Sequence, residues 1–447
     1  MSISSILEIG KRSLLAYQSA VRTTSDNISN ANNEYYRRRR VSFDQLNGGY
    51  SRLGLSVNDA VRLRQRFAEY QIYSENQFLG KYQNAQRLLS QVEVVFNEGS
   101  EAGLSQVISD FFGAWNDLAK DPESDYARNL VLDKAMVLSD TFSRIDGDLQ
   151  NIKDQIVPET NMAVDDINQK LQLIHKINQQ IRKQPNPDLL DQRDRILDEL
   201  SKQLNIQIKE KDSGEINVYS DGILLVSHDV MNELEAVQVN ENGNTKIKIQ
   251  IKKSGYALNI NNGELAALVE FYNESLPEYK EKLDSLARNL AEKVNEIHRQ
   301  GENLDGSSGF DFFASDITGI SDFRVNQVIV ENASLIASKP IGGAEGDGSI
   351  AQQISDLQFA SIFNEGTANE YYQTFLTGLG NRLQETEFLG NSQEMIIQQL
   401  KNQRDSVTGV SMDEEMTHMV QYQQAYEAAA KVITTVDEMM ATVMQMV

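Results

Sequence analysis

Apolar residues recur at heptad spacing near both ends of this 447-residue chain. The N-terminal series advances by alternate steps of four and three residues and consists of Ile3, Leu7, Gly10, Leu14, Tyr17, Val21, Thr24 and Ile28. The C-terminal series consists of Met419, Tyr422, Tyr426, Ala429, Ile433, Val436, Met440, Val443 and Val447, the last of which lies outside the residues that the structure describes. This spacing places each series on one face of a helix. The chain is therefore predicted to begin and end in coiled-coil helices whose apolar faces need partners.

Turn and cap residues predict where the two terminal helices stop and start. Asn27 and Asn30 belong to an asparagine-rich stretch that should end the first helix near residue 28. Ser411 and Glu414 form a capping box, with Gly409 just before it. The last helix is therefore expected to start at about residue 411.

Between these helices, the hydrophobic pattern predicts a helical body that contains one β-rich segment. Helices are expected at 69–97, 103–120, 124–182, 188–204, 264–300 and 351–404. Alternating apolar residues and turns such as Asp221-Gly222 predict strands from Ile206 to about Ile260. The predicted fold class is α+β, mainly α, with nested, discontinuous domains. Nesting is expected because helices before the β segment should pack with helices after it.

This nesting predicts four parts of the chain. They are a terminal helical domain (1–65 and 405–447), a long-helix bundle (66–205, 261–300 and 350–404), a β-rich subdomain (206–260) and a loop-rich segment (301–349). Both ends of the chain are expected to lie at the same end of the fold.

Composition restricts the chemistry and the partners open to the chain. The absence of cysteine excludes disulfides and thiolate catalysis. The formal charge of −23 disfavours nucleic acid as a partner, because phosphate binding needs a basic surface. Residues 1–70 differ, with 11 Lys and Arg against 6 Asp and Glu, and we interpret Arg37–Arg40 there as a solvated or subunit-facing edge. No long apolar run or signal-peptide pattern is present, so membrane insertion is not expected.

The sequence offers no pattern typical of a catalytic or metal site. The four histidines, His175, His228, His298 and His418, are far apart in the sequence, and phosphate-loop and nucleophile-elbow motifs are absent. Carboxylate pairs for acid–base chemistry stay open, since 65 acidic residues produce close pairs by chance. We predict no catalytic residue, no cofactor and no metal.

Several stretches resemble a known protein family. Asn27-Ile28-Ser29-Asn30-Ala31-Asn32, together with the segment from Gly409 to Tyr426, resembles the terminal signatures of flagellar rod, hook and hook-associated proteins. Three internal stretches are similar to the first hook-associated protein family of the hook–filament junction. They are Phe111-Phe112 with Trp115, Leu189-Leu190-Asp191-Gln192-Arg193-Asp194, and Gly309-Phe310-Asp311-Phe312-Phe313. The run from Asp191 to Asp194 is the most specific.

The resemblance implies a structural role and a set of partners. In that family the paired terminal helices form an inner tube, a helical domain surrounds it and β domains project outwards. The implied partners are other copies of the chain, the hook protein, the second junction protein and an export chaperone at the C-terminal helix. Export through the flagellar type III apparatus, without a cleaved signal peptide, would place the protein outside the cell. Many relatives carry a large β insertion after the position of Phe313, so we expect a reduced outer domain here.

Four alternatives remain at this point. The chain could be another axial protein of the rod or hook, a secreted binding module or adhesin with a helical stalk, or an enzyme embedded in an axial scaffold. The two apolar series could also pack within their own domain, as amphipathic helices usually do. We favour subunit interfaces, because a lone helix pair must offset an ordering cost of roughly 1–2 kcal/mol per residue. Neighbouring subunits would then be needed to order the ends.

Overall fold

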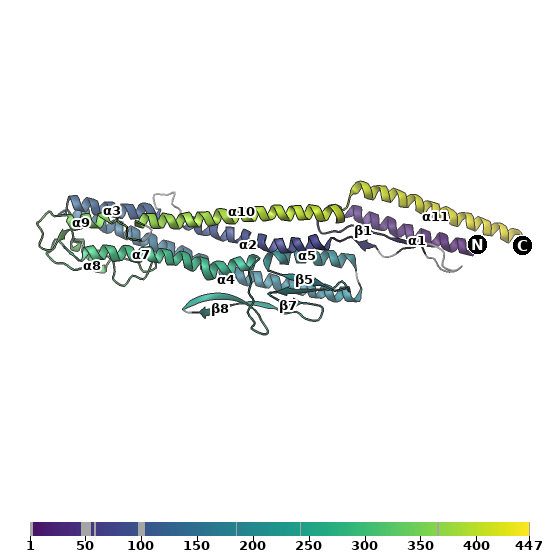
Figure 1. Ribbon diagram of the computed structural model, residues 1–447, viewed down its shortest axis with the longest axis horizontal. Coiled ribbons are helices and arrows are strands. Elements are labelled where there is room, and N and C mark those ends of the chain that lie inside the picture. Colours follow the sequence, from purple (N-terminus) through teal and green to yellow (C-terminus); the bar gives the residue numbers. More distant parts are fainter. Residues whose placement is uncertain are drawn as a thin grey trace. The chain divides into compact units, whose positions relative to one another are not determined.

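Helices dominate the computed structural model of the protein (Figure 1), which describes residues 3–45, 55–57, 60–96, 103–184, 186–241, 243–363 and 366–446. The long helices are α1 (Ile3–Ser29), α2 (Arg66–Phe96), α3 (Leu104–Lys120), α4 (Asp125–Lys183), α5 (Pro187–Gln203), α7 (Leu276–His298), α10 (Ala368–Thr408) and α11 (Met412–Met446). Shorter helical elements are α6 (Glu264–Glu270), η1 (Phe271–Ser275), α8 (Gln327–Glu331), η2 (Ala333–Leu335) and α9 (Ser349–Asp356). The predicted mainly α, α+β class is confirmed.

The chain divides into two compact units, and each is assembled from segments distant in the sequence. The first unit comprises Met1–Phe78, Ile167–Glu233 and Ser392–Val447. The second comprises Leu79–Asp166 and Leu234–Asn391. Helices α2, α4 and α10 contribute residues to both units. A nested, discontinuous arrangement is therefore present.

The strands expected between 206 and 260 form two separate sheets. In the first unit, β5 (Gln207–Glu210), β6 (Ile216–Ser220) and β7 (Ile223–Val226) make an antiparallel sheet. In the second unit, β8 (Leu234–Glu241) pairs with β9 (Asn244–Ile251). Asp221 and Gly222 join β6 to β7 with positive φ angles of 47° and 75°, the backbone that a tight hairpin requires.

Three two-stranded ribbons complete the strand content of the described residues. They are β1 (Arg39–Arg40) with β4 (Val61–Arg62), β2 (Phe43–Gln45) with β3 (Leu55–Val57), and β10 (Gly301–Glu302) with β11 (Lys339–Pro340). The ribbon of β1 and β4 brings Arg39 opposite Arg62. It therefore gathers arginines from two separate parts of the sequence.

An aromatic cluster forms part of the core of the second unit. Its fully buried rings are Phe111, Phe112, Trp115, Phe312 and Phe313. Trp115 packs edge-on against Phe312, with ring centroids 5.1 Å apart. The family-like motifs around these residues are thus core elements of the second unit.

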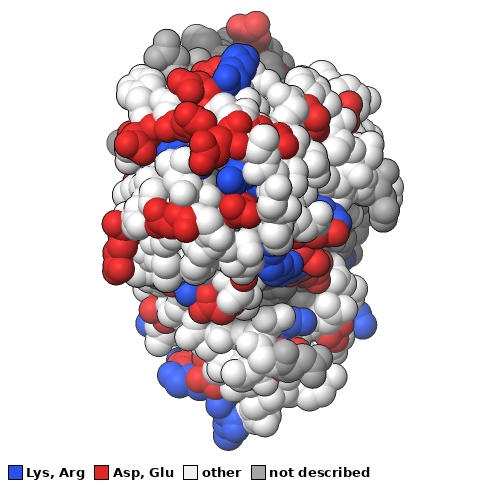
Figure 2. Space-filling view, turned by 90° about the vertical axis from the view of Figure 1, so that its left-hand side faces the viewer, with Lys and Arg blue, Asp and Glu red and all other residues white. Residues whose placement is uncertain are grey.

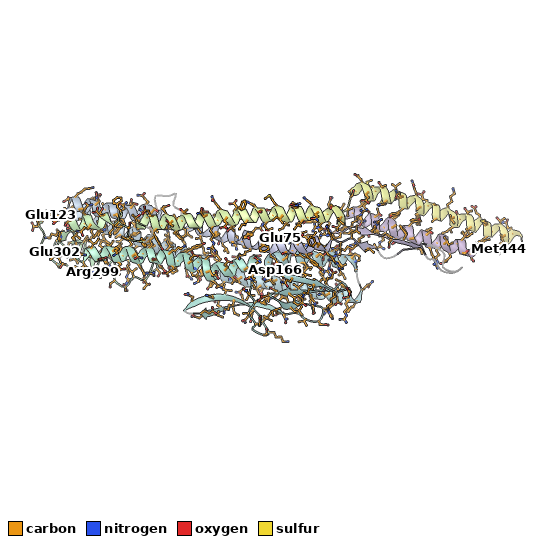
Figure 3. The ribbon with its side chains drawn as sticks, viewed as in Figure 1. Glu75, Glu123, Asp166, Arg299, Glu302 and Met444 are labelled. Atoms are coloured by element: carbon orange, nitrogen blue, oxygen red, sulfur yellow. The ribbon has the colours of Figure 1, made fainter. Side chains whose placement is uncertain are left out.

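The same unit exposes acidic side chains. Figure 2 views the left-hand end of Figure 1 and shows acidic side chains gathered on it. Glu123 and Glu302 lie at this end in Figure 3. Because like charges repel, these exposed carboxylates should oppose non-specific association between copies of the strongly negative chain.

Candidate assembly site

Helices α1 and α11 pack against each other in antiparallel orientation within the first unit. Gly10, near the start of α1, lies against Ile433 in the second half of α11. Asn27, near the end of α1, bonds to Glu415 at the start of α11. Both ends of the described chain therefore lie at the same end of this unit, as predicted (Figure 1).

Small side chains on α1 allow the two helices to approach closely. Gly10, Ala16 and Ala20 are buried along α1. A Cβ atom added at Gly10 would lie only 2.9 Å from Cγ1 of Ile433. This close contact explains why the second position of the N-terminal heptad contains a glycine, which costs helix propensity.

The pair covers the predicted apolar faces only in part. Ala429 and Val436 are buried, whereas Met440 and Val443 are 42% and 49% exposed. Gly10 and Thr24 of the N-terminal series are also buried. Intermediate exposure is found for Ile3, Leu7, Leu14, Tyr17, Val21, Ile28, Met419, Tyr422, Tyr426 and Ile433. Contact within the monomer thus accounts for one strip of each helix and leaves apolar surface beside it.

The side chain of Asn27 joins α1, β1 and α11 through hydrogen bonds, and we call this set of contacts the polar junction. The amide nitrogen of Asn27 donates to Oε2 of Glu415 and to the backbone oxygen of Arg39, each at 2.9 Å. Its amide oxygen accepts from the Tyr36 hydroxyl at 2.8 Å and from the Arg39 backbone N–H at 3.0 Å. All four hydrogen bonds that an asparagine side chain can make are formed, and the residue is only 1% exposed.

Arg38 continues this junction to the first turn of α11. It donates to Oε1 of Glu415 at 2.7 Å and to Glu414 at 3.0 Å. In a capping box the Glu414 carboxylate would accept from the backbone N–H of Ser411, and the structure differs from the predicted box in this respect. Since Arg38 offers a charged donor, Glu414 pairs with it across the fold.

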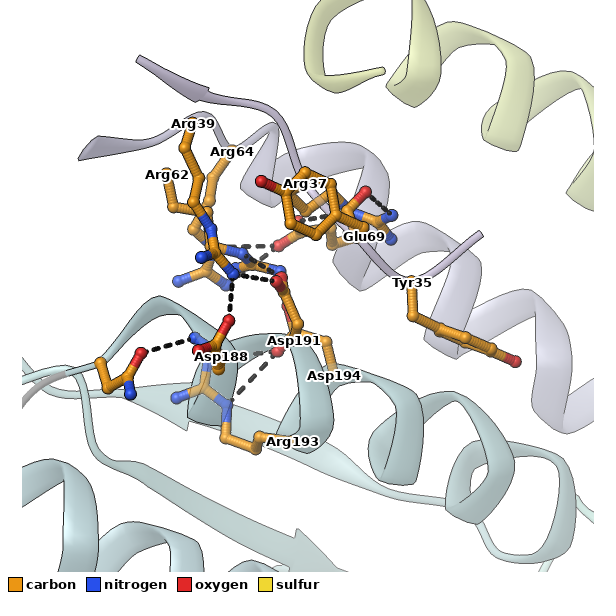
Figure 4. Close-up of polar contacts among 12 residues, drawn as sticks. Tyr35, Arg37, Arg39, Arg62, Arg64, Glu69, Asp188, Asp191, Arg193 and Asp194 are labelled. Atoms are coloured by element: carbon orange, nitrogen blue, oxygen red, sulfur yellow. Dashed lines mark hydrogen bonds and ion pairs between the residues drawn. The ribbon is translucent and has the colours of Figure 1, made fainter. Parts of the chain in front are cut away.

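Arginines of the ribbon meet the carboxylates of α5 in a dense cluster (Figure 4). Arg62 donates to Asp191 at 2.7 Å and to Asp194 at 2.6 Å. Arg39 bonds to Asp191 at 3.1 Å and also pairs with Asp188. The two arginines of β1 and β4 therefore hold α5 against the ribbon.

Arg64 and Arg193 extend the same cluster towards α2 and the β5–β6 sheet. Arg64 donates to both oxygens of Glu210, at 2.6 and 2.8 Å, and to Glu69 at 2.9 Å. Arg193 is 1% exposed and bonds to Asp194 and to the backbone oxygen of Gly214. Each guanidinium thus joins two elements of the first unit.

Electrostatics favour the ionised form of the buried Asp194. Burial by itself would raise the pKa of Asp194, but the positive charges of Arg62, Arg193 and Arg64 outweigh it and lower the pKa below its usual range. The interpretation of Arg37–Arg40 as a solvated edge is wrong for Arg37, which is buried, and for the largely shielded Arg38 and Arg39. Their charges are used inside the unit, because carboxylates distant in the sequence meet them there.

A comparison with protein-family models decides the family of the chain. The model described as the flagellar hook-associated protein FlgK helical domain matches residues 89–313. The chain belongs to the FlgK family of flagellar hook-associated proteins. A model of the C-terminal part of the flagellar basal body rod FlgEFG proteins matches residues 402–446. The helical-domain match favours a FlgK protein over the rod or hook alternative and over an adhesin.

Curated relatives extend this similarity over the whole chain. Flagellar hook-associated protein 1 of Bacillus subtilis (strain 168) is 28% identical, over 97% of this chain and 96% of the relative. The proteins of the same name from Salmonella typhimurium and Escherichia coli (strain K12) are 24% and 23% identical, and each comparison covers 97% of this chain and 98% of the relative. Like these FlgK relatives, the chain is a structural component of the flagellum.

A solved structure supports the fold. The flagellar hook junction protein FlgK from Burkholderia pseudomallei superposes with a TM-score of 0.66 at 13% identity. The match covers 74% of this chain and 99% of the solved one. At this identity the likeness concerns the architecture of the FlgK fold.

The FlgK-like motif residues separate into two groups. The first group, Asn27, Asp191, Arg193 and Asp194, belongs to the polar junction and the arginine cluster of the first unit. Gln192 is exposed, and the Asn30 side chain donates to the nearby backbone oxygen of Asp26. Phe312 and Phe313 belong to the core of the second unit. The sequence interpretation missed the partners of the motif, which are Arg62, Arg64, Glu69, Glu210 and Glu415. The alternation in Arg62-Leu63-Arg64 could have indicated a strand with two arginines on one face.

Two further observations concern other classes of site. Among the residues that the structure describes, no three His, Asp or Glu side chains form a group that could hold a metal ion. None of the helices in this part of the chain is both long and apolar enough to cross a membrane.

Proposed function

We propose that the chain acts as a subunit of the hook–filament junction that assembles through α1 and α11, with no catalytic step. One observation carries the proposal, namely the apolar surface that α11 leaves uncovered. Its exposed large apolar residues are Met412, Met416, Val420, Val432, Met439, Met440, Val443 and Met444. Exposed apolar surface of this extent is typical of a face that another protein covers.

The geometry of the pair supports a role for the uncovered surface in contacts with other subunits. Two antiparallel helices can bury one strip on each other, and here that strip contains Ala429 and Val436 on α11. The polar junction at Asn27 and the arginine cluster fix the base of the pair within the first unit. The pair is therefore held in place while its outer faces stay available.

Family membership suggests the partners and the place of assembly. We propose that copies of the chain pack through residues 1–65 and 405–447 to form the inner tube, with the bundle (66–205, 261–300 and 350–404), the 206–260 subdomain and the 301–349 segment outside it. The neighbours along the axis would be the hook protein and the second junction protein. Before assembly, an export chaperone would cover the C-terminal helix, and export would follow the flagellar type III route.

Val443→Asp tests this proposal. Val443 is 49% exposed, so an aspartate there is solvated in the monomer and leaves the α1–α11 contact unchanged. In a packed tube the same carboxylate would be buried without a partner, which is costly. We expect binding to isolated hooks to fall about tenfold or more. Sedimentation of the purified protein with hooks measures the binding, and circular dichroism checks the fold.

Gln445→Asp is the matched control. It adds the same charge two residues away, at an exposed position that points to the opposite side of the helix. This variant should bind hooks as the unaltered chain does. Equal binding by all three proteins would rule out α11 as the assembly surface, and equal loss in both variants would indicate a general effect of negative charge.

A further inference from the structure

We propose that the methionines of α11 form an oxidation-sensitive site. Oxidants of the peroxide class convert these side chains to sulfoxides in the free subunit and thereby prevent its incorporation. The inference rests on the proposed function, since it takes the outer face of α11 as the assembly surface.

Methionine is concentrated in this one helix. Seven of the 12 methionines of the chain lie in α11, at positions 412, 416, 419, 439, 440, 444 and 446. The chain has no cysteine to react first. Thioether sulfur is therefore the most readily oxidised group that the protein offers to a peroxide.

The sulfur-bearing side chains of α11 are accessible before assembly. Met416, Met439, Met440 and Met444 are 57%, 50%, 42% and 79% exposed. Met444 lies near the free end of the helix (Figure 3). A small oxidant can reach all four from solvent without any opening of the fold.

The reaction is a two-electron oxygen transfer. The peroxide O–O bond breaks, an S–O bond forms on the thioether, and the peroxide is reduced to water or an alcohol. Each event replaces an apolar, flexible side chain by a polar one that accepts hydrogen bonds. Burial of that oxygen without a donor costs free energy, so the modified face should no longer pack against a neighbour.

The buried residues of the contact between α1 and α11 contain no thioether. Ala429 and Val436, the buried residues of the predicted series on α11, have no sulfur, and the polar junction at Asn27 has none either. Oxidation should therefore leave the α1–α11 pair intact and act only on the outer face. This separation distinguishes a modification that controls assembly from general oxidative damage.

The experiment treats the free, full-length chain with hydrogen peroxide and then adds isolated hooks. Peptide mass spectrometry measures sulfoxide at each methionine, and sedimentation measures hook binding relative to an untreated aliquot of the same protein. We expect oxidation of the α11 methionines to lower binding about tenfold. Treatment with the two methionine sulfoxide reductases should restore it.

Two variants locate the effect. In the first, Met412 is changed to Leu together with Met416, Met439, Met440 and Met444, since Met412 is also 43% exposed. Peroxide does not oxidise leucine. In the second, the matched control, Met162 and Met395 are changed to Leu; they are 65% and 68% exposed but lie on α4 and α10. The first variant should keep its own binding after peroxide, and the control should lose it as the unaltered chain does.

The outcomes separate this inference from the proposed function. If the untreated, unaltered chain does not bind hooks, the assembly proposal fails. If it binds equally well before and after complete oxidation of the α11 methionines, or if reductase treatment does not restore its binding, the oxidation proposal fails while assembly stands. Equal sensitivity of the two variants would also overturn the assignment to α11.

Discussion

Asn27 shows how one side chain can join three elements. Its amide links the last turn of α1 to β1 and to the first turn of α11, with every donor and acceptor used. No other residue type of this size offers two donors and two acceptor positions together. The asparagine of the family-like signature thus has a specific structural reason.

Asn27→Ala should therefore destabilise the first unit by about 2–4 kcal/mol, because the buried groups of Tyr36, Arg39 and Glu415 lose partners. Hydrogen exchange of the α1 amides measures the loss. Asn32→Ala, an exposed change in the same turn, should cost less than about 0.5 kcal/mol. Equal effects of the two substitutions would show that the junction contributes nothing.

His298 has a comparable role in the second unit, but it also titrates. Its Nδ1–H donates to the Phe310 oxygen at 2.7 Å, and its Nε2 accepts from the Ala337 N–H at 2.9 Å. Burial lowers the pKa of His298 from 6.5 to about 4, assisted by Arg128 and opposed by the bond to Phe310 and by Asp311. The neutral ring is thus the form that the core accepts.

The second unit should lose stability as pH falls from about 6.5 to about 4. Within this window the unfolded chain binds a proton on His298 that the folded chain does not, so acid favours unfolding, by up to roughly 3 kcal/mol. Urea unfolding followed by the fluorescence of Trp115, whose ring centroid lies 6.1 Å from that of His298, measures this dependence.

His298→Asn provides the comparison. The variant should be less stable at pH 7, but its stability should depend less steeply on pH over the same window, while the carboxylates titrate in both proteins. Parallel pH curves for the two proteins would contradict the assignment to His298.

At the scale of elements, ion pairs between the ribbon and α5 organise the first unit. Arg62 is buried with two carboxylates, and removal of one partner from such a group leaves uncompensated buried charge. The heptads predicted α1 and α11, and helix signals predicted α2 to α5. The ion pairs were beyond prediction from sequence, because Arg62 and Asp194 are 132 positions apart and no local pattern relates them.

Arg62→Ala is accordingly expected to cost about 3–5 kcal/mol, since Asp191 and Asp194 would remain buried beside an empty space. Arg195→Ala on α5, the helix that carries Asp191 and Asp194, is the control, because Arg195 and Glu199 form an exposed pair. That change should cost less than about 0.5 kcal/mol. Hydrogen exchange of the α5 amides measures the loss of stability in each variant and distinguishes Arg62→Ala from Arg195→Ala.

The close contact of α1 with α11 makes a second prediction at this scale. Gly10→Val would press a branched side chain onto Ile433 and should weaken the pair by about 1–3 kcal/mol. Gly147→Ala, in a part of α4 with open space around it, should instead stabilise its helix by up to about 1 kcal/mol. Amide exchange in the two helices gives both values, and stabilisation by Gly10→Val would contradict the contact.

At the scale of the whole molecule, hydrophobic periodicity was enough to predict a nested, mainly helical chain. It did not predict that the strands of 206–260 belong to two sheets in different units. The alternation that predicts a strand is the same in both sheets, so it carries no information about which strands pair. The exposure of Met440 and Val443 beside buried Val436 was also invisible, because a heptad does not state how much of its face one partner covers.

This partial cover leads to a prediction for the free subunit. Amides beyond Val436 in α11 should exchange rapidly with solvent, whereas those between Glu415 and Val436 should be protected by contact with α1. Addition of isolated hooks should slow exchange in the outer segment about tenfold or more. Unchanged exchange on hooks would mean that the exposed end of α11 is not an assembly surface.

The pairing of α1 with α11 also fixes an order in time. Asn27 and Glu415 are 388 positions apart, so α1 leaves the ribosome well before its partner exists. At synthesis rates of 5–20 residues per second, this delay is roughly 20 to 80 seconds. During that interval the apolar face of α1 cannot pack against α11, because α11 has not been synthesised. Closure of the first unit therefore cannot begin before the ribosome has synthesised α11.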